Sequence, residues 1–212
     1  DVIGNTILFT GDDGIDVRDS SFADLSDNGI FFTLGDGIQV RDSSFVQIDD
    51  NFIRFAGDDG IDFEEGFFSA ITDNNIRFVG NNGVEINDSN FILVDGNTIS
   101  DAADAGIFID PSFVVFVTNN QVSNSDKGLY VQGPGNGYIN VMGNTFTNNR
   151  VGARFESGII DLTGIGPGGY GNKFIAGANG EVGIEFEDVS KSGQGLSLVD
   201  SDGGFTHDGT FD

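Results

Sequence analysis

The chain has 212 residues and a formal net charge of -25, which comes from 34 acidic and 9 basic side chains. Nucleic acid is therefore excluded as a natural partner, because its recognition relies on clustered Lys and Arg. The absence of cysteine excludes disulfides, thiolate zinc sites and a cysteine nucleophile. No apolar run is long enough to insert into a membrane.

Asparagine residues recur at a fixed interval along the chain. The interval is 23 residues five times and then 24 residues, which gives Asn5, Asn28, Asn51, Asn74, Asn97, Asn120 and Asn144. Nine residues after each of the first five asparagines lies a glycine, and an aliphatic residue follows it: Gly14-Ile15, Gly37-Ile38, Gly60-Ile61, Gly83-Val84 and Gly106-Ile107. A fixed period of this kind is typical of solenoids, in which each repeat forms one structural unit.

The first period predicts three short strands, over residues 5–9, 14–18 and 22–25. Their apolar residues alternate with period two, which is the pattern of a strand with one buried face. Gly-Asp-Asp-Gly and Asp-Ser-Ser separate the strands and have the composition of turns. The following periods repeat this arrangement in register.

The spacing loosens after Pro111, and an insertion rich in glycine occupies residues 164–171. Strands are expected again over residues 172–175, 183–186 and 196–199. We predict one β-helix domain over residues 1–199, with regular rungs over 1–118 and irregular rungs over 119–199. Residues 200–212 are rich in Gly and Asp and are expected to form a tail or linker.

Equivalent strands of successive periods are expected to stack, so that equivalent residues form columns. The asparagines should form an internal amide ladder at a turn. The Ile7 column is expected inside the solenoid, and so are two columns of phenylalanine: Phe9, Phe32, Phe55 and Phe78, and Phe22, Phe45, Phe68 and Phe91.

The period length, the three strands per period, the Gly-Ile-x-Val step and the asparagine column together resemble a known superfamily. The chain looks like an all-β, right-handed parallel β-helix of the pectate-lyase-like type, with about eight rungs. The resemblance implies the fold more strongly than the activity, since the superfamily includes polysaccharide lyases, hydrolases, epimerases, phage tail spikes and non-catalytic adhesins. A regular repeat without a unique site is closest in character to the non-catalytic surface, adhesin or filament β-solenoids.

Carboxylates gather in the repeated Gly-Asp-Asp-Gly-Ile-Asp motif, which occurs at residues 11–16 and 57–62. Stacking should place them in columns one strand spacing apart, where a hard cation could bind a carboxylate from each of two rungs. The candidate ligands for Ca²⁺ are Asp12, Asp13, Asp16, Asp36, Asp58, Asp59 and Asp62. The alternative interpretation is a solvated acidic turn without a metal, and both remain open.

The same motif resembles the Asp-Asp segment of polygalacturonase-like hydrolases, in which paired carboxylates act as general acid and base. That resemblance would implicate Asp12 with Asp13, or Asp58 with Asp59. The motif is repeated, however, and the Gly-His-Gly and Arg-x-Lys partners of that family are missing. The single histidine, His207, lies in the expected tail. No catalytic residue is therefore assigned, and a non-catalytic protein is favoured.

These observations predict a secreted or cell-surface structural or adhesive β-solenoid. Val2 falls on the column of Leu25, so the chain starts inside a coil. We expect either continuation of a longer chain or end-to-end self-association of the open solenoid end. The alternative prediction is a carbohydrate-active enzyme or a polysaccharide-binding module.

Overall fold

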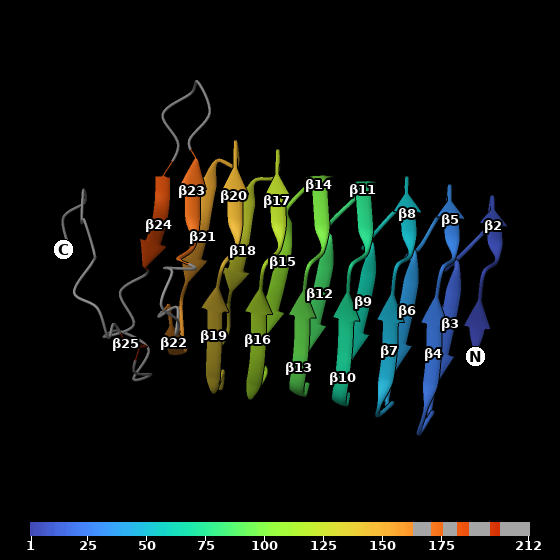
Figure 1. The fold of residues 1–212 in the computed structure, drawn as a ribbon, viewed down its shortest axis with the longest axis horizontal. Coiled ribbons are helices and arrows are strands. Elements are labelled where there is room, and N and C mark those ends of the chain that lie inside the picture. The colour runs from blue at the N-terminus through green and yellow to red at the C-terminus, as the bar shows by residue number, and fades with distance from the viewer. Residues whose placement is uncertain (163–170, 176–181, 187–195, 200–212) are drawn as a thin grey trace.

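The computed structural model describes residues 1–162, 171–175, 182–186 and 196–199. These residues form an all-β solenoid whose three parallel sheets run along the long axis of the molecule (Figure 1). Within these segments no helix has the length and apolar character that a membrane span requires. All but the last residue of the predicted insertion over 164–171, and the predicted tail with His207, lie outside the described residues.

Each sheet contains every third strand of the chain. Sheet A consists of β1 (Val2–Ile3), β4 (Ala23–Ser26), β7 (Val46–Asp49), β10 (Phe67–Thr72), β13 (Asn90–Asp95), β16 (Val114–Thr118), β19 (Tyr138–Met142), β22 (Gly158–Asp161) and β25 (Leu196–Val199). Sheet B consists of β2 (Thr6–Leu8), β5 (Gly29–Phe31), β8 (Phe52–Arg54), β11 (Asn75–Val79), β14 (Thr98–Ala102), β17 (Gln121–Ser123), β20 (Thr145–Thr147) and β23 (Lys173–Ile175). Sheet C consists of β3 (Ile15–Arg18), β6 (Ile38–Arg41), β9 (Ile61–Glu64), β12 (Val84–Asn87), β15 (Ala105–Asp110), β18 (Lys127–Val131), β21 (Val151–Phe155) and β24 (Val182–Phe186).

One strand from each sheet makes one rung, and the rungs stack in the register that the sequence period predicts. Ile15 pairs with Ile38, and Ile38 pairs with Ile61, one period further on each time. The expected late strands are present as β23, β24 and β25. The prediction of a parallel β-solenoid with three short strands per rung is therefore confirmed.

The interior consists of stacked aliphatic columns. The predicted Ile7 column continues through Ile30, Ile53, Ile76 and Ile99, and these four residues are fully buried. The glycine of the Gly-Ile-x-Val step is required by close packing against this column. A Cβ atom on Gly60 would lie 2.4 Å from Cγ2 of Ile76 and 2.5 Å from the carbonyl oxygen of Gly83, so a side chain at this position would collide with both.

The asparagine column forms the predicted internal ladder at the entrance to sheet B. Nδ2 of Asn51 donates to Oδ1 of Asn74 at 3.0 Å and to the carbonyl oxygen of Leu25 at 2.7 Å. The backbone N–H of Asn51 also donates to the same Oδ1 at 2.9 Å. The side chains of Asn51 and Asn74 are almost fully buried, and the ladder satisfies polar groups that would be costly to bury unpaired.

The two phenylalanine columns lie outside the solenoid, so the prediction that they belong to the core was wrong. Their side chains are 37% to 75% exposed and stack on one another along the surface. The alternation that starts at Ile53 predicts an inward Phe55, but Phe55 has a φ of 63°. This left-handed backbone conformation turns the chain at a corner and directs the ring to the outside.

Candidate acidic site on sheet C

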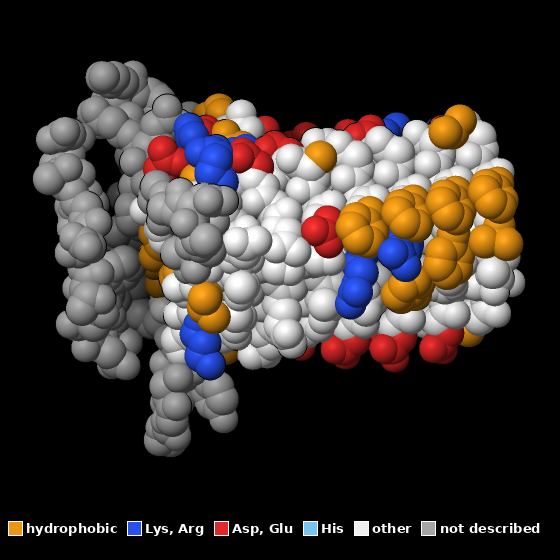
Figure 2. All heavy atoms as spheres, turned by 90° about the horizontal axis from the view of Figure 1, so that it is seen from above, with side chains coloured by type: hydrophobic (Ala, Val, Ile, Leu, Met, Phe, Trp, Pro, Cys, Tyr) orange, Lys and Arg blue, Asp and Glu red, His pale blue; other side chains and the backbone are white. Residues whose placement is uncertain are grey.

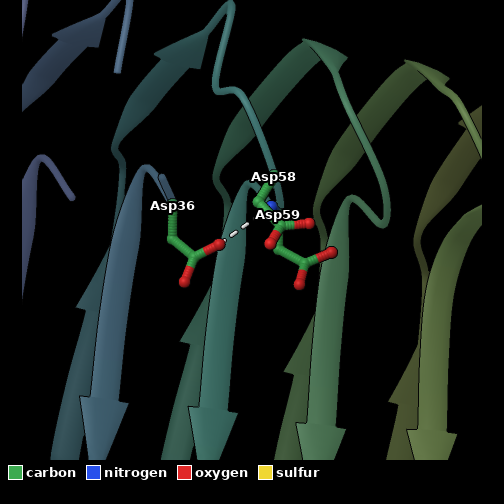
Figure 3. Close-up of side chains that lie close together, drawn as sticks. All are labelled: Asp36, Asp58 and Asp59. Atoms are coloured by element: carbon green, nitrogen blue, oxygen red, sulfur yellow. Dashed lines mark hydrogen bonds between the residues drawn. The ribbon is translucent and has the colours of Figure 1, made fainter. Parts of the chain in front are cut away.

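Three carboxylates from two successive rungs meet at the start of sheet C. Asp36 lies in the turn before β6, and Asp58 and Asp59 lie in the equivalent turn before β9. One carboxylate oxygen of each lies within 4.8 Å of the others. Figure 3 shows the three side chains close together, with the carboxylate of Asp36 directed toward the backbone of Asp59. Asp36 and Asp59 are buried, whereas Asp58 is exposed. We call these three residues the acidic cluster.

Asp13, Asp36 and Asp59 form one column, and each accepts a hydrogen bond from the backbone of the next rung. Oδ1 of Asp13 accepts a hydrogen bond from the N–H of Asp36 at 2.8 Å, and Oδ1 of Asp36 accepts one from the N–H of Asp59 at 2.9 Å. Asp59 in turn accepts from the N–H of Asn82 at 2.6 Å. Each side chain thus satisfies a buried turn amide one rung further on, which gives the column a structural role that needs no metal.

A second acidic row runs beside the cluster on the outer face of sheet C. Nε2 of Gln39 donates to Oδ2 of Asp36 at 3.1 Å and to Oδ2 of Asp62 at 3.3 Å. One rung further, Glu85 is level with Asp62 and accepts a hydrogen bond from Nδ2 of Asn82 at 2.6 Å. Amide side chains therefore separate some of the carboxylates in the two columns.

Burial is the main reason that three of these carboxyls resist ionisation. It raises the pKa of Asp36 to about 6, with the charge of Asp13 adding to the effect. It raises the pKa of Asp62 to about 7 and that of Asp59 to about 9, in the latter case with help from the charge of Glu85. At neutral pH the raised pKa of Asp59 favours a protonated carboxyl where a solvated carboxylate would be ionised.

The structure brings together three of the seven predicted metal ligands, namely Asp36, Asp58 and Asp59. Asp12 lies in the column of Asp58 but two rungs away, with Gly35 between them. Asp13 lies one rung before Asp36 and accepts a hydrogen bond from its backbone N–H.

The remaining two predicted ligands have other partners. Asp16 forms an ion pair with Arg18 at 2.9 Å. Asp62 accepts from Gln39 and lies 3.8 Å from the guanidinium of Arg41. The compact cluster therefore contains fewer residues than the predicted set of ligands, although all seven lie in the columns that the repeat predicts.

The outer row of sheet C changes character in the later rungs, which the sequence reasoning missed. Glu85 is followed in register by Phe108, Tyr130 and Arg154. Nζ of Lys127 lies 4.8 Å and Cζ of Arg154 5.5 Å from the centre of the Tyr130 ring. The Tyr130 hydroxyl donates to Glu156 at 2.7 Å. The period of 23 residues leads from Glu85 to Phe108 but not beyond, so only the pairing of strands reveals the continuation to Tyr130 and Arg154.

The donor set of the acidic cluster fits a hard divalent cation. When both are ionised, two carboxylates within 4.8 Å of each other repel by roughly 3 kcal/mol or more at an effective dielectric constant near 20. A Ca²⁺ ion takes oxygen ligands at about 2.3 to 2.6 Å and would bind between them. Asp59, whose pKa burial raises to about 9, lies beside the exposed Asp58.

Three parallel sheets, stacked in-register rungs and an internal asparagine ladder define the class of single-chain parallel β-helices. The chain belongs to the family described as right handed beta helix region, which matches residues 1–151. No curated protein sequence matches the chain significantly.

Three solved structures share the fold at low sequence identity. The pectate lyase Pel9A has a TM-score of 0.59 at 11% identity, over 89% of this chain and 54% of its own. The alginate lyase from Paenibacillus sp. str. FPU-7 has a TM-score of 0.57 at 15% identity, over 90% of this chain and 75% of its own. The periplasmic alginate epimerase AlgG has a TM-score of 0.55 at 17% identity, over 92% of this chain and 50% of its own. The chain thus spans about half the length of the pectate lyase and the epimerase.

Proposed function

We propose that this chain is part of an extracellular adhesive β-solenoid that binds an acidic polysaccharide along sheet C through a bridging divalent cation. The acidic cluster is the observation that carries the proposal. It places three carboxylates from two rungs within 4.8 Å of one another, and its exposed member, Asp58, faces solvent.

The coordination chemistry favours a ternary contact over simple cation storage. Ca²⁺ takes six to eight oxygen ligands, and the cluster offers one carboxylate from each of three residues. Open positions on the ion would accept carboxylate and hydroxyl oxygens of a uronic acid chain. Without the ion, a chain of net charge -25 would repel such a polymer, so binding should depend strictly on the cation.

The comparisons support the same ligand class. The pectate lyase, the alginate lyase and the alginate epimerase are named for polysaccharides that carry carboxylates. An adhesive role rather than a purely catalytic one accords with the regular repeat, which extends the acidic columns over several rungs.

The test is binding of pectate and alginate oligosaccharides by calorimetry, in calcium and in chelator. We expect binding in calcium only, and its loss in the variant Asp58→Asn, Asp59→Asn. The matched control is Asp27→Asn, Asp50→Asn, which makes the same two Asp-to-Asn substitutions at exposed left-handed positions of another corner. Binding that persists in chelator, or that the control variant loses equally, would contradict the proposal.

A second function, catalysis on the same polymer, is favoured by one specific observation. Burial keeps Asp59 protonated at neutral pH beside Asp58, which resembles the acid and base pair of a glycoside hydrolase. Incubation with each polymer, followed by assays for reducing ends and for unsaturated sugars, would detect hydrolysis or elimination. Activity that the single variant Asp59→Asn abolishes would assign an enzyme to this site.

A further inference from the structure

Two ladders of stacked phenylalanines run along the outside of the rod at different corners. The first ladder, between sheets B and C, consists of Phe9, Phe32, Phe55 and Phe78. The second ladder, between sheets C and A, consists of Phe22, Phe45, Phe68 and Phe91. Neighbouring ring centres are 4.9 to 5.4 Å apart in the first and 4.9 to 5.5 Å apart in the second. The two ladders therefore have the same pitch.

Local backbone preferences do not explain phenylalanine at these positions. Except for Phe22, every member of the two ladders has a φ between 51° and 63°, a region that favours Asn, Asp and Gly over bulky residues. In later rungs the first ladder is continued by Asp101, Asn124 and Asn148, with φ values of 57° to 60°. The corner can thus be formed by polar residues, and the exposed rings require another reason.

Two arginines border the first ladder. Arg54 and Arg77 stack on β8 and β11, and Cζ of Arg54 lies 4.7 Å from the centre of the Phe55 ring and 5.0 Å from that of Phe78. Within the described part of the chain neither arginine forms an ion pair, and Nε of Arg54 is buried without a hydrogen-bond partner. Figure 2 shows a row of hydrophobic side chains along the rod with basic side chains beside it. A shallow groove of about 500 Å³, lined by Phe32 and Leu34, adjoins the ladder.

An acidic row borders the second ladder. Its members lie three residues before each phenylalanine and are all exposed: Asp19, Asp42, Glu65 and Asp88. None of them forms an ion pair with a described residue. A hydrogen bond to Asp42 and the charge of that residue raise the pKa of Glu65, as expected where like charges stack without a counterion.

We propose that the two ladders are complementary halves of a side-by-side contact between copies of this chain, in which Arg54 and Arg77 of one copy face the acidic row of the next. Equal pitch allows the rings of one ladder to interdigitate with those of the other over several rungs. The opposite bordering charges set which ladder pairs with which. A contact between the second ladders of two copies would instead place two acidic rows against each other, and they would repel.

The contact joins two different surfaces, so it is heterologous. Each pair of copies keeps one free ladder of each kind, so association continues beyond two copies, into a closed ring or an open array. This lateral contact requires neither a polysaccharide nor end-to-end stacking. Since each rod carries a net charge of -25, association should need enough salt to screen the long-range repulsion.

Variants in which the charges beside one ladder are reversed test the proposal. Their association is measured by sedimentation velocity, in chelator and without polysaccharide. We expect the wild-type chain to associate with increasing concentration. The variant Arg54→Glu, Arg77→Glu and the variant Asp42→Lys, Glu65→Lys should each associate at least ~tenfold more weakly. An equimolar mixture of the two should associate again, because a ladder bordered by acidic residues on one variant can then pair with a ladder bordered by basic residues on the other.

Control variants separate this contact from a general effect of net charge or of misfolding. Asp27→Lys, Asp50→Lys changes the charge equally at exposed left-handed positions of the third corner and should leave association unchanged. Phe32→Asn, Phe55→Asn adopts the residue type of later rungs and should abolish association while circular dichroism and the melting transition stay intact. A wild-type chain that stays monomeric at high concentration, or a mixture of charge variants that fails to associate, would overturn the proposal.

Discussion

The carboxylate of Asp36 accepts a hydrogen bond from the backbone N–H of Asp59 at 2.9 Å, one rung further along the solenoid. The same contact recurs from Asp13 to Asp36 and from Asp59 to Asn82. A carboxylate is a good acceptor for a turn amide, but burying it penalises its charged form. Hydrogen bonding therefore stabilises the ionised column while desolvation destabilises it, and the net contribution of the column to stability depends on pH.

Stability should fall as the pH rises from about 4 to 9. The native pKa values of Asp36, Asp62 and Asp59 are raised to about 6, 7 and 9, whereas an unfolded Asp has a pKa near 3.9. The native state thus binds more protons over this interval, and the free energy of unfolding decreases with pH. Urea unfolding at intervals of one pH unit would measure the slope, and a flat or rising profile would contradict the raised values.

Below pH 4 the opposite dependence should appear. The hydrogen bond from Arg150 lowers the pKa of Asp126 to about 2, so the stabilisation from this pair is lost as the pH falls through that range. In the same urea series the variant Asp126→Asn should be destabilised at pH 6 and should approach the wild type near pH 2. An equal deficit at both pH values would argue against an ionised Asp126.

The variant Asp59→Asn should be more stable than the wild type above pH 7 and should have a smaller pH slope. Asparagine retains the oxygen that accepts from the N–H of Asn82, and it cannot ionise. The chain already uses this residue one rung further, where Oδ1 of Asn82 accepts from the N–H of Ala105 at 3.1 Å. The exposed Asp27→Asn is the matched control and should leave the slope unchanged. Loss of stability in Asp59→Asn at pH 8 would show that the charge itself stabilises the turn.

Aliphatic columns were predictable from the sequence because they obey period-two alternation without interruption. Ile61 and Phe63 are both fully buried on β9, as that alternation requires. Phe55 breaks the rule because alternation holds only while the backbone stays extended, and its φ of 63° ends the strand. Nothing in the identity of Phe signals a left-handed corner, since Asn, Asp and Gly are the residues that normally mark one.

Two phenylalanine substitutions distinguish the inner and outer rows. Phe63→Ala should cost ~3 to 5 kcal/mol, because it empties a buried volume. Phe55→Asn should change stability by no more than ~1 kcal/mol, because relief of the left-handed conformation offsets the lost ring stacking. Chemical denaturation of both variants measures the difference. A large loss in Phe55→Asn would indicate that the exposed ladder stabilises the single chain.

The acidic site was predicted as columns but not as a compact cluster. The repeat places Asp36 and Asp59 in one column, and any in-register solenoid would do the same. Their burial, the bridging Gln39 and the inclusion of exposed Asp58 depend on how the turn before each sheet C strand folds over the next rung. Such packing is not encoded in a period, so the sequence alone predicted seven ligands where the structure gathers three.

Calcium should stabilise the chain most at high pH, where it competes with the fewest protons. At a concentration 100 times its dissociation constant, a ligand specific for the native state adds about 2.7 kcal/mol. For a chain of this size that corresponds to a rise of ~5 to 10 °C in melting temperature. Thermal unfolding at pH 8 in calcium or in chelator measures the shift, which should shrink at pH 5. The variant Asp58→Asn, Asp59→Asn should not respond, while Asp27→Asn, Asp50→Asn should respond as the wild type does. A melting temperature that calcium leaves unchanged at pH 8 would contradict cation binding at the acidic cluster and would favour the alternative of a solvated acidic turn.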